Sequence, residues 1–178
     1  MIEKNDKYIY IVISKTNTVL GRFIQNRLRT DYNHCSLGLD KELEVFYAFG
    51  RKQLRNMFRA GFVEESKSKG FFKEYGNSKI IVLRIGVTEK QYADLVECIE
   101  EFKKNRHCYK YSALGLLFCH LGIPVKRKDK YFCAQFVAEA MKMADIPFLD
   151  KHTTLVRPHD FLEVKTAEII YQGPINNY

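Results

Sequence analysis

Two residues of the chain have the types and settings that nucleophilic chemistry needs. Cys133 stands at the predicted start of an amphipathic helix, and His34 lies in the strand-like segment 33–39. Unsatisfied N–H groups and the dipole at a helix N-terminus stabilise a thiolate. A neighbouring imidazole can take the thiol proton and later protonate a leaving group. The sequence therefore predicts a cysteine nucleophile with a histidine partner.

The sequence around both residues resembles a known family. Tyr32-Asn33-His34-Cys35-Ser36-Leu37-Gly38-Leu39 is followed far downstream by Tyr131-Phe132-Cys133-Ala134-Gln135-Phe136-Val137. This order, over roughly residues 13–145, resembles the circularly permuted branch of the NlpC-type papain-fold hydrolases, which includes bacterial YiiX-like proteins and, more distantly, lecithin:retinol acyltransferase. The resemblance implies a papain-like fold and cleavage of a peptide or isopeptide amide through an acyl-enzyme intermediate.

A third polar residue should orient the imidazole, and two candidates follow His34. A two-residue turn at Asp40-Lys41 would pair Leu39 with Glu42 and place His34 opposite Tyr47. Glu44 is chemically the better orienter, and a one-residue bulge would change the register in its favour. Both Tyr47 and Glu44 stay open at this point.

Stabilisation of the oxyanion requires hydrogen-bond donors near the nucleophile. We expect the backbone N–H of Cys133 to be one donor. The family resemblance implies a tyrosine from the segment just upstream as the other, which here is Tyr109 or Tyr111.

The predicted elements alternate irregularly along the chain. Strands are expected at 8–13, 33–39, 43–49, 80–85 and 168–172, and helices after the N-cap candidates Thr16–Thr18, from the Thr88/Gln91 capping box to about Lys104, at 111–121 and at 133–145, with a short helical turn at 158–160. The segment 50–76 is expected to be a loop with a short helix around 53–58. The pattern predicts one α+β domain over residues 1–178, with an antiparallel sheet of about five strands packed against helices.

Composition narrows the classes of partner and compartment. The chain has 29 basic and 21 acidic residues, a net charge of +8, but the basic residues are dispersed, so we do not expect nucleic acid as a partner. No run approaches the roughly 20 apolar residues of a membrane span, and no signal peptide is visible. Five cysteines, an odd number, favour reduced thiols and a cytoplasmic location.

No cofactor or metal is expected. His107-Cys108 and Cys119-His120 are adjacent doublets separated by a predicted helix, whereas zinc ligands usually pair within two to four residues on a tight knuckle. The predicted partner is a substrate that contains a peptide or other amide bond.

Two other functions stay open. Ala134 stands where the family usually has serine, and the usual orienting residue is missing, so a basic, non-catalytic binding module on the same fold is one alternative. An acyltransferase or thioesterase is another, because an acyl-enzyme can pass its acyl group to different acceptors. Hydrolysis is preferred because no acyl-chain or membrane-binding segment is visible.

Overall fold

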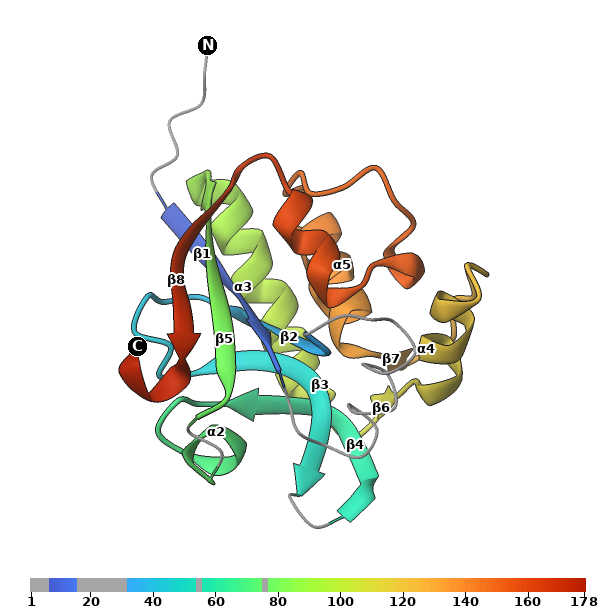
Figure 1. Cartoon of the computed structure of the whole chain (residues 1–178). Helices are drawn as coiled ribbons and strands as arrows, with labels where there is room; N and C mark the ends of the chain where they lie inside the picture. The colour runs from blue at the N-terminus through green and yellow to red at the C-terminus, as the bar shows by residue number, and fades with distance from the viewer. Residues whose placement is uncertain (1–6, 16–31, 54–55, 75–76) are drawn as a thin grey trace.

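The computed structural model describes residues 7–15, 32–53, 56–74 and 77–178 (Figure 1). In chain order its elements are β1 (Lys7–Ser14), β2 (His34–Gly38), β3 (Phe46–Gln53), β4 (Asn56–Glu65), α2 (Gly70–Glu74), β5 (Lys79–Val87), α3 (Glu89–Lys104), β6 (Lys110–Tyr111), α4 (Ala113–His120), β7 (Lys130–Tyr131), α5 (Cys133–Met143), the 3-10 turns η1 (Thr153–Leu155) and η2 (Pro158–Glu163), β8 (Ala167–Pro174) and η3 (Ile175–Asn177). Within these ranges, no helix is both long and apolar enough to cross a membrane.

The strands β1 to β5 and β8 form one antiparallel sheet in the order β4-β3-β2-β1-β5-β8. β1 lies inside the sheet, and its Ile11 pairs with Leu37 of β2 on one side and Leu83 of β5 on the other. The predicted α+β class with antiparallel pairing is confirmed. The sheet has six strands instead of about five, because β4 was not foreseen.

Alternation along β1 divides the apolar side chains between two faces of the sheet. Ile9, Ile11 and Ile13 belong to the larger core cluster, which α3 and α5 cover (Figure 1). Tyr10 and Val12 belong to a smaller cluster on the other face, together with side chains from α2 and η3. The sheet is therefore buried on both faces, and α5 is held against the larger core.

The helix that carries Cys133 begins where the sequence predicts. Phe132 is its N-cap residue with an extended backbone, and Cys133 is the first helical residue. The helix ends at Met143, slightly before the predicted end, and Asp145 just beyond it has a φ of 53°. The predicted capping box of α3 is also present, since Thr88 accepts from the Gln91 N–H and the Gln91 side chain accepts from the Thr88 N–H.

The expected tight turn at Asp40-Lys41 is wrong. β2 ends at Gly38 and β3 begins at Phe46, and the register pairs Leu37 with Tyr47. The connection is longer because it places Leu43 in the smaller core, where its side chain is fully buried. This burial shifts the register that was expected to place Tyr47 opposite His34.

The described part of the segment 50–76 is also not the expected loop, and the described residues of the short helix expected around 53–58 lie in strands. β3 continues to Gln53, and β4 returns antiparallel to it, with Phe49 opposite Phe62 and Phe46 opposite Glu65. Burial of Phe62 against β3 offsets the glycine-rich, basic composition that had indicated a loop. The helix predicted after Thr16–Thr18 lies outside the described residues.

A cluster of aromatic rings joins the sheet to the helices beside the start of α5. The ring centroid of Phe49 lies 5.9 Å from that of Phe62, 6.0 Å from Phe102, 5.1 Å from Tyr131 and 5.4 Å from Phe136. These neighbours belong to β4, α3, β7 and α5, so one β3 side chain contacts four other elements.

Replacing Phe49 tests the importance of this cluster. Phe49→Ala should lower the free energy of unfolding by about 3–5 kcal/mol, because it leaves a cavity among buried rings. The exposed aromatic Tyr8 on β1, whose ring lies against the Arg84 guanidinium, is the matched control, and Tyr8→Ala should cost no more than about 1 kcal/mol. Urea unfolding of both variants measures the difference. Equal costs would show that the cluster does not hold the layers together.

Candidate functional site

Cys133 occupies the first turn of α5 and is almost completely buried, with 4% of its surface exposed. No side chain caps this helix end. The first-turn N–H groups of an α-helix have no partner within the helix, so they stabilise negative charge at this position. The sulfur is therefore at the place in the fold where a thiolate is most favourable.

The sequence-predicted partner lies next to it. His34 is the first residue of β2, and its imidazole is hydrogen-bonded to the Cys133 sulfur. The other side of the ring is also occupied, because His34 Nε2 lies 3.0 Å from Glu65 Oε1 and 3.2 Å from Glu65 Oε2. Since Nε2 faces the carboxylate, Nδ1 is the nitrogen left for the sulfur.

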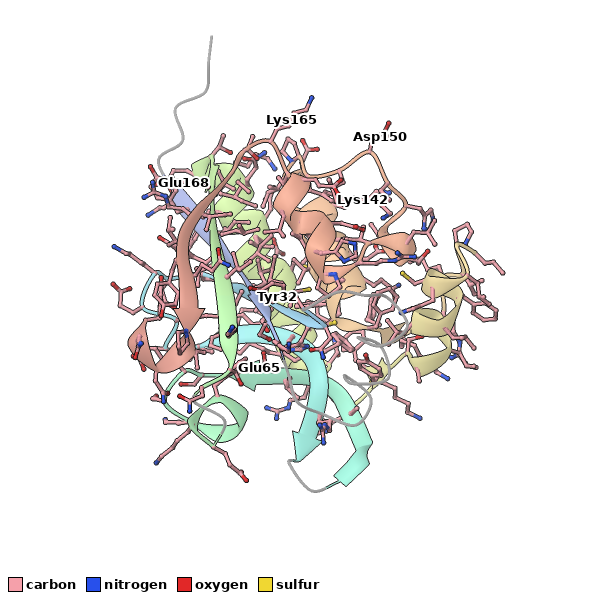
Figure 2. All side chains as sticks on the ribbon, in the orientation of Figure 1. Tyr32, Glu65, Lys142, Asp150, Lys165 and Glu168 are labelled. Carbon is pink, nitrogen blue, oxygen red and sulfur yellow. The ribbon has the colours of Figure 1, made fainter. Side chains whose placement is uncertain are left out.

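Glu65 is the last residue of β4 and is labelled in Figure 2. With Cys133 and His34 it forms a hydrogen-bonded series of three side chains. The His34 and Glu65 side chains are only 12% and 14% exposed. Ser36, two residues after His34 on β2, also donates to Glu65 Oε2. The Ser36 hydroxyl thus fixes the Glu65 carboxylate, and the carboxylate in turn fixes the orientation of the His34 imidazole.

Gly50 of β3 leaves the space in which these side chains meet. A β-carbon at this position would lie 3.6 Å from His34 Cε1 and 3.8 Å from Glu65 Oε1. These are ordinary van der Waals distances, so a methyl group would fit but a larger side chain would have to displace the imidazole or the carboxylate.

The two orienting residues predicted from the sequence are not at His34. Tyr47 is paired with Leu37 and stacks on Phe62 within the core, at a centroid distance of 6.1 Å. Glu44 is exposed and lies 3.8 Å from Lys67 Nζ. Both expectations depended on the short turn after β2, which the burial of Leu43 excludes.

Glu65 was not predicted because the sequence of β4 indicated a loop. The strand-like pair Phe62 and Val63 just before Glu65 was the sequence feature that could have indicated this strand.

Cys35 is a second thiol at the site that the sequence did not single out. It follows His34 on β2, is fully buried, and its side chain is hydrogen-bonded to Cys133. Burial raises the pKa of Cys35 well above its usual range, and the hydrogen bond to Cys133 raises it further. Cys35 therefore stays protonated and donates its S–H to the Cys133 sulfur.

The pKa values of Cys133 and His34 move in opposite directions. The hydrogen bond from Cys35 is the largest effect on Cys133, and with the hydrogen bond and charge of His34 it outweighs burial and holds the Cys133 pKa well below its usual range. Burial is the largest effect on His34 and lowers its pKa. The charge of Glu65 and the hydrogen bonds that the ring donates to Cys133 and Glu65 nevertheless raise the His34 pKa to about 10. Both shifts favour a thiolate and an imidazolium over the neutral pair.

The two tyrosines proposed as oxyanion donors have different surroundings. Tyr111 of β6 pairs with Tyr131, two residues before Cys133, and after burial the charge of Cys133 is the strongest cause of its raised pKa. Tyr109 packs on Phe102 at a centroid distance of 4.7 Å, within the aromatic cluster. The structure therefore brings Tyr111, and not Tyr109, beside the thiol.

The described ranges hold no group of three or more His, Cys, Asp or Glu side chains that could bind a metal ion. Cys119 and His120 are at the end of α4, whereas Cys108 lies on the exposed turn before β6. All five cysteines are free thiols.

Alkylation by iodoacetamide tests the ionised pair. The Cys133 rate, followed by peptide mass spectrometry, should fall less between about pH 8 and pH 6 than that of an ordinary thiol, because the lowered pKa keeps more of the sulfur ionised. A thiol with a pKa of about 8.5 loses close to tenfold in rate for each pH unit below that value. The exposed Cys108 gives the reference profile within the same sample. Parallel profiles for the two cysteines would contradict the ion pair.

The chain was also compared with known proteins. No family model matches it, and no curated protein sequence matches it.

Proposed function

We propose that the chain is a cysteine hydrolase with the permuted papain-like, NlpC-type arrangement, and that it cleaves a peptide or isopeptide amide through an acyl-enzyme. The observation that carries this proposal is the hydrogen-bonded series Cys133, His34 and Glu65 at the start of α5. The order of a histidine strand before a cysteine helix, on an antiparallel sheet, supports the same arrangement.

In the acylation step, the Cys133 thiolate attacks the carbonyl carbon of the scissile amide. The resulting oxyanion receives hydrogen bonds from the backbone N–H of Cys133 and from the Tyr111 hydroxyl. The His34 imidazolium gives its proton to the amide nitrogen, the C–N bond breaks and the amine leaves. The products of this step are a thioester on Cys133 and a neutral imidazole on His34.

In the deacylation step, the neutral His34 takes a proton from water, which attacks the thioester carbonyl. The second oxyanion collapses, the C–S bond breaks, and the Cys133 thiolate and the His34 imidazolium are restored. Glu65 holds the imidazole in one orientation throughout and favours its charged form. It acts through His34 and is a positioning residue.

The free thiols of all five cysteines suit a reducing compartment, and we propose that the enzyme is cytoplasmic. The non-catalytic alternative depended partly on a missing orienting residue. Glu65 occupies that place, so this reason for the alternative is removed.

The proposed function is tested with p-nitrophenyl acetate, whose acetyl group should be transferred to Cys133 with a burst of nitrophenolate. Cys133→Ala should abolish the burst, and His34→Gln should slow acylation by about 10²–10⁴-fold. Glu65→Gln should slow it on the order of 100-fold and move the alkaline limb of the pH profile to lower pH, because the Glu65 charge raises the His34 pKa.

The neighbour Glu64 provides the matched control for Glu65. Glu64 is on the same strand as Glu65, and its side chain is 39% exposed. Its Oε1 lies 3.6 Å from Arg106 Nη1. Glu64→Gln removes an equal charge and should leave the burst within about threefold of the unchanged protein, since surface substitutions away from a site have small effects. A burst that survives Cys133→Ala would refute the hydrolase proposal and favour a binding module.

The role of Tyr111 is tested by removal of its hydroxyl. Tyr111→Phe should lower kcat by about 10²–10³-fold, the usual cost of one oxyanion donor, with a smaller change in KM. Tyr109→Phe is the matched control because Tyr109 belongs to the aromatic cluster, and its kcat should stay unchanged within about threefold. Equal effects of the two substitutions would assign Tyr111 a packing role only.

A further inference from the structure

Two thiols from distant parts of the chain meet at the first turn of α5. The S–H of Cys35 on β2 donates a hydrogen bond to the Cys133 sulfur, and the Cys35 backbone N–H donates to the same sulfur. The paired residues of β2 on β3 begin at Leu37, which leaves the Cys35 N–H outside that ladder. Both cysteines belong to the larger core. The fold therefore holds one sulfur against the other.

The two thiols differ in ionisation and in exposure. The hydrogen bond from Cys35 is the largest of the effects that lower the pKa of Cys133, whereas burial raises the pKa of Cys35. Oxidants react with thiolates in preference to thiols. Cys133 is 4% exposed and lines a small hollow with room for about one water molecule, while Cys35 is fully buried. A very small oxidant therefore reacts with Cys133, and Cys35 is placed to react with the product.

The other three cysteines have different surroundings. Cys119 lines the same hollow, but its S–H donates to a backbone carbonyl just after η1, at 3.9 Å. Cys98 of α3 donates to a methionine sulfur at the end of α5, at 3.8 Å. Cys108 is exposed on the turn before β6. Cys35 is thus the cysteine whose thiol is directed at Cys133.

We propose that Cys133 and Cys35 form a redox modification site, in which a small hydroperoxide oxidises Cys133 and Cys35 then closes a disulfide with it. The sulfur chemistry is independent of hydrolysis. Its effect on activity rests on the proposed function, because a disulfide removes the Cys133 nucleophile. In a reducing compartment, protein disulfides are usually transient and redox-sensing, which suits a reversible pair.

The reaction is written here for hydrogen peroxide. The Cys133 thiolate attacks one peroxide oxygen, the O–O bond breaks, and the leaving hydroxide takes the proton of the His34 imidazolium. The products are a sulfenic acid on Cys133, a neutral imidazole and water. The Cys35 sulfur then attacks the Cys133 sulfur, the S–O bond breaks, and the hydroxide leaves as water with the Cys35 proton. The two sulfurs are oxidised by the electron pair that reduces the peroxide to water.

Peroxide treatment of the full chain tests the pair. After treatment the peroxide is removed with catalase, free thiols are alkylated in denaturant, and tryptic peptides are analysed without reduction. Trypsin separates the two cysteines into peptides 30–41 and 131–142. We expect these peptides to be linked, about 2 Da lighter than the two reduced peptides together, and to separate after dithiothreitol. Cys133 that stays reduced, or is oxidised without a link to Cys35, would overturn the inference.

Substitutions then identify the thiol that closes the disulfide. Cys35→Ser keeps a hydrogen-bond donor for Cys133 but cannot form the link, so Cys133 should proceed to the sulfinic acid, about 32 Da heavier, which dithiothreitol does not reverse. Cys119→Ser is the matched control, a buried thiol at the same hollow, and should leave the link to Cys35 intact. Loss of the link in Cys119→Ser would assign the role to Cys119 instead. The link in the unchanged chain decides the inference if Cys35→Ser does not fold.

The nitrophenolate burst separates this inference from the proposed function. Peroxide should lower the burst of the unchanged protein by at least about tenfold, and dithiothreitol should restore most of it, whereas Cys35→Ser should regain little. A burst in the reduced protein with no link after peroxide would refute the redox pair and leave the hydrolase intact. A link between Cys35 and Cys133 with no burst in the reduced protein would refute the hydrolase instead.

Discussion

The mutual neutralisation of a buried thiolate and a buried imidazolium is the interaction on which the site depends. Either charge alone would be costly at this depth, because burial disfavours the ionised form of both groups. Three further contacts make the pair favourable: Glu65 on the imidazole, the Cys35 thiol on the sulfur, and the unpaired N–H groups at the start of α5. Charge separation in the resting protein is thus a result of where the chain places these groups.

The fold supplies each of these contacts from a different element, so the site requires the whole assembly. β2 carries His34 and Cys35 as neighbours, β4 ends at Glu65, and α5 begins at Cys133. Phe49 packs against rings from the elements around the helix start, which holds α5 in position over the sheet. Gly50, the next residue, leaves the space for His34 and Glu65, so one stretch of β3 both supports the helix and admits the polar side chains.

Local signals in the sequence predicted most of the elements, and contacts between distant strands decided what was missed. The capping box at Thr88 and the apolar periodicity after Cys133 are local, so α3 and the start of α5 were predictable. The register of β2 on β3 depends on the burial of Leu43 in a core made by other elements, which no turn preference reveals. For the same reason His34 and Cys133 could be named from their own surroundings, whereas Glu65 and Cys35 become part of the site only through tertiary pairing.

The protonation state of His34 is the most direct test of the ion pair. The ring nitrogens of ¹⁵N-histidine-labelled protein are followed by NMR over a range of pH, and His34 is assigned by comparison with His34→Gln. The ion pair requires an imidazolium at neutral pH that loses its proton near pH 10, in agreement with the raised pKa. A neutral ring at pH 7, with a pKa near the ordinary value of about 6.5, would contradict it.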